Sequence, residues 1–167
     1  VVIEPPPIPE FAGHFEPKTA KVLRLRVWFG KLRDMAMVGH LDLAKLFERA
    51  VRQASIPISF SGGFHPSPRI MVASALPLGA TSAGEIADFE LNEAMDAVEF
   101  KQSLIAQLPE DVPIYRVEPV DLSTPVASRL LERAEYLIKV APKDVADGFA
   151  PLWGSWIDKV MGGNSCL

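Results

Sequence analysis

Residues 61–70 read SGGFHPSPRI and combine backbone freedom, stiffness and ligand-binding side chains in one short segment. The two glycines permit positive φ and let a partner approach the backbone, while the two prolines fix φ and stiffen the chain. Phe64 could stack on a base, His65 offers hydrogen bonds and Arg69 could reach a phosphate. These features predict a stiff recognition loop. The alternative is a wide hairpin turn with Phe64 packed into the core and His65 in solvent.

The segment before this loop has the pattern of an amphipathic helix. In residues 39–54, GHLDLAKLFERAVRQA, apolar side chains recur every three or four positions. Asp42 falls in the first turn, where a carboxylate suits the helix dipole. Lys45, Arg49 and Arg52 share the outer face of this helix. They form either a basic stripe that binds a polyanion or an ordinary solvated surface.

The sequence contains no arrangement of nucleophiles or metal ligands that predicts catalysis. It lacks a Gly-Lys-Ser/Thr phosphate loop and a dinucleotide fingerprint, and its three histidines have no zinc-site spacing. A single cysteine, Cys166, excludes an intrachain disulfide and a thiolate metal site. Catalysis would require His40, Asp42 and His65 to converge in space, which stays a third possibility.

Composition and charge indicate a globular chain with an uneven surface. Of the 167 residues, 49% are hydrophobic and 23% charged. No apolar run approaches ~18 residues and the N-terminus lacks a secretory leader, so we expect no membrane partner and a cytoplasmic location. Residues 18–70 carry ten Lys or Arg against three Asp or Glu, whereas residues 84–167 carry seven against fifteen. This polarity predicts a basic binding face on an acidic body, or charges that folding mixes.

The elements that would hold these residues follow from the hydrophobic period. A period of two predicts strands, and a helical period predicts helices at 40–54 and 96–110. The predicted strands cover residues 21–32, 56–62, 85–92 and 112–117, with a further apolar run at 70–78. The resulting order is the ferredoxin-like split βαβ arrangement, an α+β fold with both helices on one face of an antiparallel sheet. We also expect an extended central hairpin.

The same periods assign faces to particular side chains. In the first strand, Arg24 and Arg26 point outward onto an exposed sheet face, and the inward side chains are Leu23, Leu25, Val27 and Phe29. The second helix is expected to bury Val98, Leu104, Ile105 and Leu108.

Three regions are expected along the chain. Residues 1–20 read as a proline-rich linker and residues 21–122 as the ferredoxin-like domain. Residues 123–167 read as a partial second α+β unit or a C-terminal extension, with a strand at 134–140 and a helix that carries Trp153 and Trp156. A chain that opens on such a spacer without an initiator methionine is expected to be a piece of a longer protein.

The segment from residue 39 to residue 79 resembles a known family when it is taken as a unit. It resembles the radical-SAM-linked family of uncharacterised bacterial domains, which accompany a radical SAM enzyme, and the resemblance covers residues 21–140. His65 stands where this family has asparagine, and Gly39 where serine is common. The matching positions are His40, Leu41, Asp42, Arg49, Arg52, Pro57, Ser61, Gly63, Phe64, Pro66, Pro68, Arg69, Pro77, Leu78 and Gly79.

The resemblance implies a C-terminal accessory domain that works near RNA or translation. A radical SAM cluster needs three cysteines, so this chain is not the radical enzyme and we expect no cofactor within it. The first hypothesis is a recognition domain that presents an RNA or RNA-linked substrate to a radical SAM domain in the same or a neighbouring chain. The rival is a protein-interaction module that docks on that domain through residues 70–78 or the Trp153/Trp156 segment. The candidate binding residues are His40, Asp42, Arg49, Arg52, Ser61, Gly63, Phe64, His65 and Arg69.

Overall fold

The computed structural model describes residues 16–137. The predictions for residues 1–15 and 138–167, which include the helix with Trp153 and Trp156, lie outside the described residues. The described elements, in chain order, are β1 (Leu23–Lys31), the 3-10 helix η1 (Arg33–Met37), α1 (His40–Gln53), β2 (Ile70–Val72), β3 (Ser82–Leu91), α2 (Ala97–Ile105), β4 (Ile114–Val120) and α3 (Ala127–Leu130).

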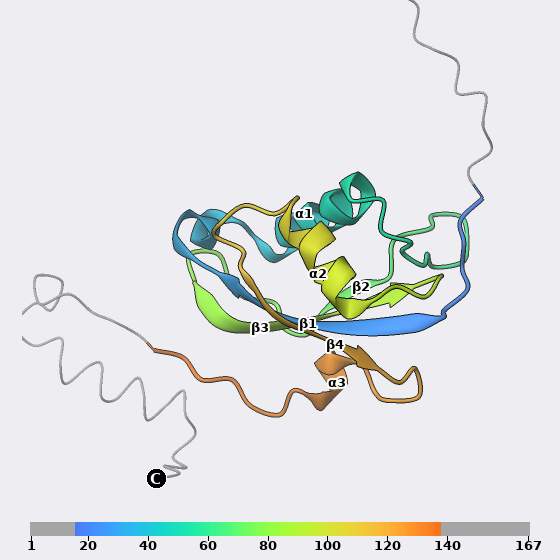
Figure 1. The fold of residues 1–167 in the computed structure, drawn as a ribbon. Helices are drawn as coiled ribbons and strands as arrows, with labels where there is room; N and C mark the ends of the chain where they lie inside the picture. The colour runs from blue at the N-terminus through green and yellow to red at the C-terminus, as the bar shows by residue number, and fades with distance from the viewer. Residues whose placement is uncertain (1–15, 138–167) are drawn as a thin grey trace, which may run out of the picture. The chain divides into compact units, whose positions relative to one another are not determined.

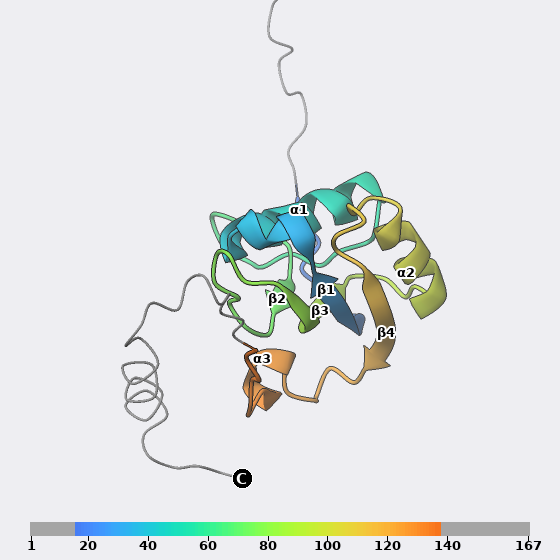
Figure 2. The ribbon, with the colours of Figure 1, turned by 90° about the vertical axis from the view of Figure 1, so that its left-hand side faces the viewer.

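The four strands form one antiparallel sheet in the order β2-β3-β1-β4. Helices α1 and α2 cover one face of this sheet, and the short α3 lies on the opposite face (Figures 1 and 2). The strand order and the placement of α1 and α2 are those of the split βαβ arrangement, so the predicted α+β class is confirmed.

The core lies between the sheet and the two helices. Every second side chain of the two central strands, β1 and β3, points into it. Leu25, Val27 and Phe29 of β1 are fully buried, as predicted, beside Ala87 and Phe89 of β3. Four phenylalanine rings continue the core from strand to helix in successive edge-to-face contacts with centroids 5.0–5.5 Å apart, namely Phe29, Phe47, Phe89 and Phe100.

Helix α2 is held at its start by a side chain. The Asp96 carboxylate accepts hydrogen bonds from the backbone N–H groups of Val98 and Glu99. Its buried face differs from the prediction, because Phe100 and Leu104 enter the core while Val98 and Ile105 are exposed. The helix begins at Ala97 and ends at Ile105, and Phe100, four positions before Leu104, completes the inner stripe.

The strand predicted at residues 56–62 is wrong. This segment makes only two isolated bridges, Ile58 with Leu91 and Phe60 with Pro68, and the edge strand is β2 further along the chain. Prolines at positions 57, 66 and 68 remove backbone donors from both sides of the expected ladder.

The outer face of the sheet is not open where it was expected to be. Arg24 and Arg26 do point away from the core, but residues 121–130, which we call the strap, cross over them and bury Arg24. Arg24 donates to the Thr124 carbonyl at 2.6 Å and Arg26 to the Pro125 carbonyl at 3.1 Å. Of these two outward charges, Arg24 is therefore buried and Arg26 is largely covered.

Strand β4 forms one edge of the sheet, and two features occupy that edge. Lys101 of α2 donates to the backbone carbonyl of Tyr115 at 2.7 Å. Pro119 stands in the same strand opposite Leu25, at an edge where the absence of an N–H is tolerated.

The chain divides into two compact units, Val1–Glu132 and Arg133–Leu167. The elements above all belong to the first unit. In the second, the described residues 133–137 form no helix or strand, and the rest of the strand predicted at 134–140 lies outside the described residues. Within residues 16–137, every helix is too short or too polar to cross a membrane.

Candidate functional site

Residues 61–67, called the tip loop from here on, form a loop that is closed on itself. The Ser61 N–H donates to the Ser67 carbonyl at 2.8 Å, and the Ser67 N–H donates to Ser61 Oγ at 2.9 Å. Gly63 has φ +109°, a conformation that side chains with a Cβ rarely adopt. The sequence therefore closes the loop with two serines and turns it with one glycine.

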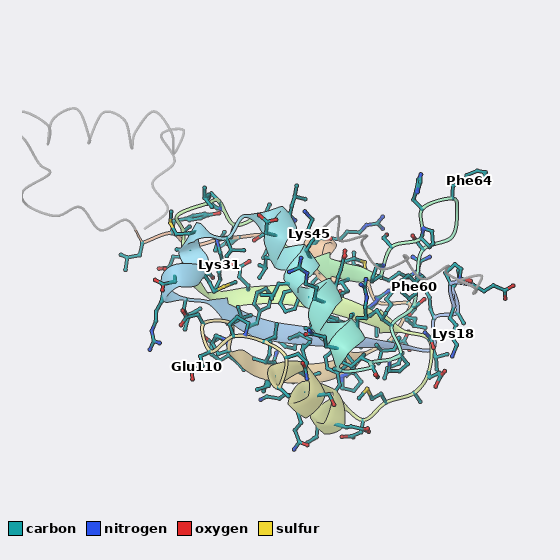
Figure 3. The ribbon with its side chains drawn as sticks, turned by 90° about the horizontal axis from the view of Figure 1, so that it is seen from above. Lys18, Lys31, Lys45, Phe60, Phe64 and Glu110 are labelled. Carbon is teal, nitrogen blue, oxygen red and sulfur yellow. The ribbon has the colours of Figure 1, made fainter. Side chains whose placement is uncertain are left out.

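Phe64 stands at the outer end of the tip loop with its ring fully in solvent. Its exposed fraction is 102%, and Figure 3 shows the side chain directed away from the body of the domain, beyond Phe60. His65 is also exposed. The alternative that Phe64 packs into the core is wrong, and the ring is free to meet a ligand.

Arg69 lies just behind the tip loop and braces it. Its Nε donates to the Phe60 carbonyl at 3.0 Å, and its backbone N–H donates to the Ser59 carbonyl at 2.8 Å. Its Nη1 lies 3.9 Å from the Glu90 carboxylate. One nitrogen of the guanidinium thus fixes the loop base while the other two remain on the side of Glu90 and solvent.

A groove of about 480 Å³ lies between the C-terminal half of α1 and the segment that leads into the tip loop, and we call it the α1 groove. Its floor is apolar, with Val51, Ile56, Ile58, Phe60 and Pro68. Its rim carries two cations, Lys18 and Arg52, and three carboxylates, Glu16, Glu48 and Glu93. Lys18 is paired with Glu93 at 2.7 Å. The groove is therefore amphipathic and is not a strongly basic channel.

Of the predicted site residues on α1, Arg52 shares a groove with the residues that flank the tip loop. Arg52 lines the α1 groove together with Phe60 and Pro68, which flank the loop on either side. Among residues 16–137 Arg52 has no ion-pair partner, and it is exposed. Ser61, Gly63, Phe64, His65 and Arg69 are neighbours within or beside the loop.

Of the other predicted residues, His40 and Asp42 lie at the start of α1, whereas Arg49 lies three residues before Arg52 but does not line the α1 groove. Asp42 and Arg49 line a smaller cavity of about 200 Å³, where Asp42 also lies 3.7 Å from Lys45. His40 is the first residue of α1, roughly 18 Å along the helix from Arg52 at 1.5 Å per residue. Figure 3 shows Lys45 well apart from Phe64. A catalytic grouping of His40, Asp42 and His65 is not assembled.

His40 has its own environment at the start of α1. The helix begins after Gly39, whose N-cap position supplies no side-chain hydrogen bond. The Nδ1 atom of His40 is buried and makes no hydrogen bond within the described part of the chain. His40 is therefore separated from the tip loop both in distance and in contacts.

Three cations surround Glu90, and of these the predicted site contains Arg69 but neither Lys21 nor Arg24. The Glu90 carboxylate is buried on the outer face of β3, where Arg24 donates to Oε1 at 2.8 Å and Lys21 Nζ lies 3.0 Å from Oε2. Burial opposes ionisation of Glu90, but the hydrogen bond from Arg24 and the proximity of Lys21 outweigh it and lower the pKa of this carboxyl. With Arg69, three cations surround one carboxylate.

Sequence reasoning missed this group because its members come from separate segments. Lys21, Arg69 and Glu90 are brought together by the pairing of β1 with β3 and of β2 with β3. In the sequence Glu90 looks like an ordinary outward residue of an alternating strand. Only the pairing of Arg24 with Glu90 across the sheet could have been anticipated, once the register was known.

On the rest of the outer sheet face, the charged side chains contact partners within the sheet and the strap. Arg26 donates twice to Asp88, at 2.8 and 3.0 Å, which raises the pKa of Arg26, and Asp88 also accepts the N–H of Ala127. The guanidinium of Arg116 lies 3.6 Å over the ring of Trp28. These side chains already have partners, so this sheet face offers no row of free aromatic rings for stacking bases.

Within residues 16–137 no three His, Cys, Asp or Glu side chains are grouped as metal ligands. Comparison with known families gives one result. A family model described as "Uncharacterized protein conserved in bacteria (DUF2344)" matches residues 24–166, a range that includes the α1 groove, the tip loop and the cations around Glu90. No curated protein matches the sequence.

Proposed function

We propose that this chain, which belongs to that uncharacterised family of bacterial proteins, is a recognition domain that presents an RNA or an RNA-linked substrate to a radical SAM enzyme. The family match agrees with the resemblance found in the sequence at the level of an uncharacterised bacterial family. The radical SAM partner rests on the resemblance of residues 39–79 alone, and it belongs to the proposal.

The observation that carries the proposal is the exposed ring of Phe64. A large apolar side chain held wholly in solvent gains nothing for the fold, because it buries no surface. The two Ser61–Ser67 hydrogen bonds and the Arg69 brace hold the loop in place before any ligand arrives. A pre-ordered loop loses little entropy on binding, which favours recognition.

Single-stranded RNA suits this geometry better than a duplex does. An exposed ring can stack on an unpaired base, while nearby cations contact the backbone. Arg69 is bonded to the Phe60 carbonyl at the loop base, and Arg52 lines the groove that Phe60 and Pro68 also line, so both are candidates for contacts to the ribose-phosphate backbone of a base stacked on Phe64. The paired charges of the outer sheet face point to the loop, and not to the sheet, as the binding surface.

Phe64→Ala should remove the aromatic ring on which a base would stack. Stacking of one base is worth about 1–3 kcal/mol, so the substitution should weaken binding of a single-stranded oligoribonucleotide roughly tenfold or more. Fluorescence anisotropy with the full chain and a labelled oligomer of mixed sequence, at about 50 and 200 mM salt, measures this loss. The melting temperature should not change, because Phe64 contributes nothing to the core.

Leu41→Ala is the matched control. Leu41 is another exposed apolar side chain, on the first turn of α1 and outside the tip loop. It should bind the oligomer as the unaltered chain does. Equal affinity for Phe64→Ala and the unaltered chain would remove the loop from the proposal.

A second candidate function, docking on a protein, is favoured by the apolar side chains near the start of α1. Lys31 is fully buried and donates to the carbonyls of Ala36 and Ala80, which fixes η1 beside the connection between β2 and β3. Met37 and Leu78 remain exposed on these two segments. The apolar run at residues 70–78 was predicted as a docking surface. Its first three residues form β2 in the sheet and Leu76 is buried, so Leu78 is the large apolar side chain of this run that a partner could contact.

The two candidates differ in their dependence on salt. Binding to RNA through backbone phosphates weakens steeply as salt rises, whereas an apolar interface is little affected. The docking function would be supported if this chain bound a radical SAM domain equally well at low and moderate salt and did not bind the oligoribonucleotide.

A further inference from the structure

We propose that Lys21 and Arg69, held together by Glu90, form a phosphate-binding subsite at the base of the tip loop. The inference rests on the proposed function for its biological ligand, but the chemistry is that of any phosphate group. It names a contact that the predicted site lacks, since Lys21 lies outside the helix and loop that were singled out.

Glu90 is surrounded by more cations than one carboxylate can neutralise. Arg24, with its hydrogen bonds at 2.8 and 3.3 Å, neutralises the Glu90 carboxylate. The neighbouring Arg26 is matched by Asp88 in the same way. Lys21 and Arg69 also lie within ion-pair distance of Glu90, so this carboxylate faces more positive charge than it can balance.

Another carboxylate reduces the excess without removing it. Asp121 of the strap interacts with Arg24 through space, and its pKa is lowered mainly by the hydrogen bonds from the Ser123 hydroxyl and N–H. It lies beyond 4.0 Å from Lys21 and Arg69. Counting Asp121 with the three cations and Glu90, one positive charge is still unmatched.

The geometry leaves donors available for an anion. Lys21 Nζ and Arg69 Nη1 both approach the same oxygen, Glu90 Oε2, at 3.0 and 3.9 Å. A lysine ammonium carries three N–H donors and a guanidinium five, so the contact with this one oxygen leaves donors on both side chains for an anion. The side chains are 41% and 30% exposed, so solvent reaches both cations while Glu90 itself stays buried.

Glu90 acts here as a positioning residue. It keeps an ammonium and a guanidinium close together, against their mutual repulsion, because Lys21 Nζ and Arg69 Nη1 lie 3.0 and 3.9 Å from the same carboxylate oxygen. Because Arg69 Nε is bonded to the Phe60 carbonyl, the subsite is attached to the tip loop. A nucleotide stacked on Phe64 would thus have a phosphate partner fixed at the base of the same loop.

Lys21→Gln tests the subsite in the full chain. The Lys21 side chain is 41% exposed, and Glu90 keeps its hydrogen bonds from Arg24 when Lys21 is replaced, so the fold should tolerate the change. Losing one phosphate contact should lower the affinity for the oligoribonucleotide and reduce the salt slope of log K by about 0.7. Inorganic phosphate should shift the backbone amide signals of residues 21, 69 and 90 in the unaltered chain, and shift them less in Lys21→Gln.

Lys45→Gln is the matched control, because Lys45 is an exposed lysine of α1 beside Asp42 and outside the subsite. It should keep both the affinity and the salt slope. If Lys45→Gln loses as much as Lys21→Gln, the effect is general charge and the subsite is overturned. A second variant, Arg69→Lys, keeps the charge but removes the fork and should also bind more weakly.

The outcomes separate the subsite from the proposed function. If phosphate shifts these signals in a Lys21-dependent way but the oligoribonucleotide does not bind, the subsite holds for a free phosphate or another phosphorylated ligand, and the RNA function fails. If the oligoribonucleotide binds in a Phe64-dependent way while Lys21→Gln is without effect on either probe, the subsite is overturned and the RNA function stands.

Discussion

At the scale of single residues, the buried carboxylate of Glu90 shows how a charged group can be retained in this fold. Burial alone would favour its protonated form, and the cations Arg24 and Lys21 reverse that preference and lower its pKa. The same carboxylate orients Arg69 near the tip loop. Its ionisation therefore affects both the stability of the sheet and the charge at the loop.

The pH dependence of stability should reflect Glu90. Its pKa is lower in the folded chain than its ordinary value of 4.5, so the ionised group adds stability that is fully present above the unfolded pKa and is lost as pH falls through the folded pKa. Urea unfolding of the unaltered chain and of Glu90→Gln, from pH 7 down to about pH 2.5, checks this. The advantage of the unaltered chain should shrink in acid. An advantage that is constant over this range would contradict the lowered pKa.

At the scale of elements, the two main helices begin in different ways. Helix α2 starts on the Asp96 carboxylate, which accepts two backbone N–H groups, whereas α1 starts after Gly39 without a side-chain cap. Helix α1 depends instead on the burial of its inner face, with Leu43, Phe47, Ala50 and Val51 in the core. Side-chain capping therefore stabilises the start of α2, whereas α1 is stabilised mainly by the packing of its inner face.

Asp96→Ala should destabilise the domain by about 1 kcal/mol, because two N–H groups of the first turn lose their acceptor. Urea unfolding at neutral pH measures the loss. Asp34→Ala, which removes an exposed acid from η1, is the control and should change stability by less than about 0.5 kcal/mol. An equal effect of both would mean that charge and not capping is being measured.

The elements could be predicted where a local pattern determines them. The period of two predicted β1 with Leu25, Val27 and Phe29 inward, and the helical period predicted α1. The edge strand was misplaced because three prolines interrupt the apolar segments on which a pairing was expected. The inner face of α2 was misjudged because its hydrophobic residues are not confined to one stripe, so that the period alone did not select Phe100.

The candidate site was predictable only in part, for reasons of sequence separation. The tip loop could be predicted because its glycines, prolines and aromatic ring are close together in the sequence. The cations around Glu90 and the burial of Arg24 by the strap depend on pairings between residues far apart in the sequence, such as Arg24 with Glu90, 66 positions away, and with Thr124, 100 positions away. No local pattern in β1 distinguishes an arginine in solvent from one covered by a distant segment.

At the scale of the whole first unit, the strap closes the face of the sheet that the helices leave uncovered. Asp88 is fully buried and connects three parts of the chain, since it belongs to β3, pairs with Arg26 of β1 and accepts the N–H of Ala127 in α3. The strap is thus attached by charges in the sheet and not by an apolar core of its own.

Asp88→Ala should lower the free energy of unfolding by about 3–5 kcal/mol, because it leaves Arg26 without its partner and Ala127 without its acceptor. Urea unfolding measures the loss, and hydrogen exchange at the Ala127 amide should become much faster. Glu118→Ala, an exposed acid of β4, is the control and should change stability by less than about 1 kcal/mol. Unchanged exchange at Ala127 would mean that the strap is held by other contacts.

The occupied edge of β4 limits how another protein can bind to this domain. A strand that tried to extend the sheet there would find the Tyr115 carbonyl already bonded to Lys101 and no N–H at Pro119. Strand addition is a common way for sheets to capture peptides and for identical chains to polymerise. At β4, an added strand or a second copy of the chain would therefore meet a row of backbone donors and acceptors that is interrupted at Tyr115 and at Pro119.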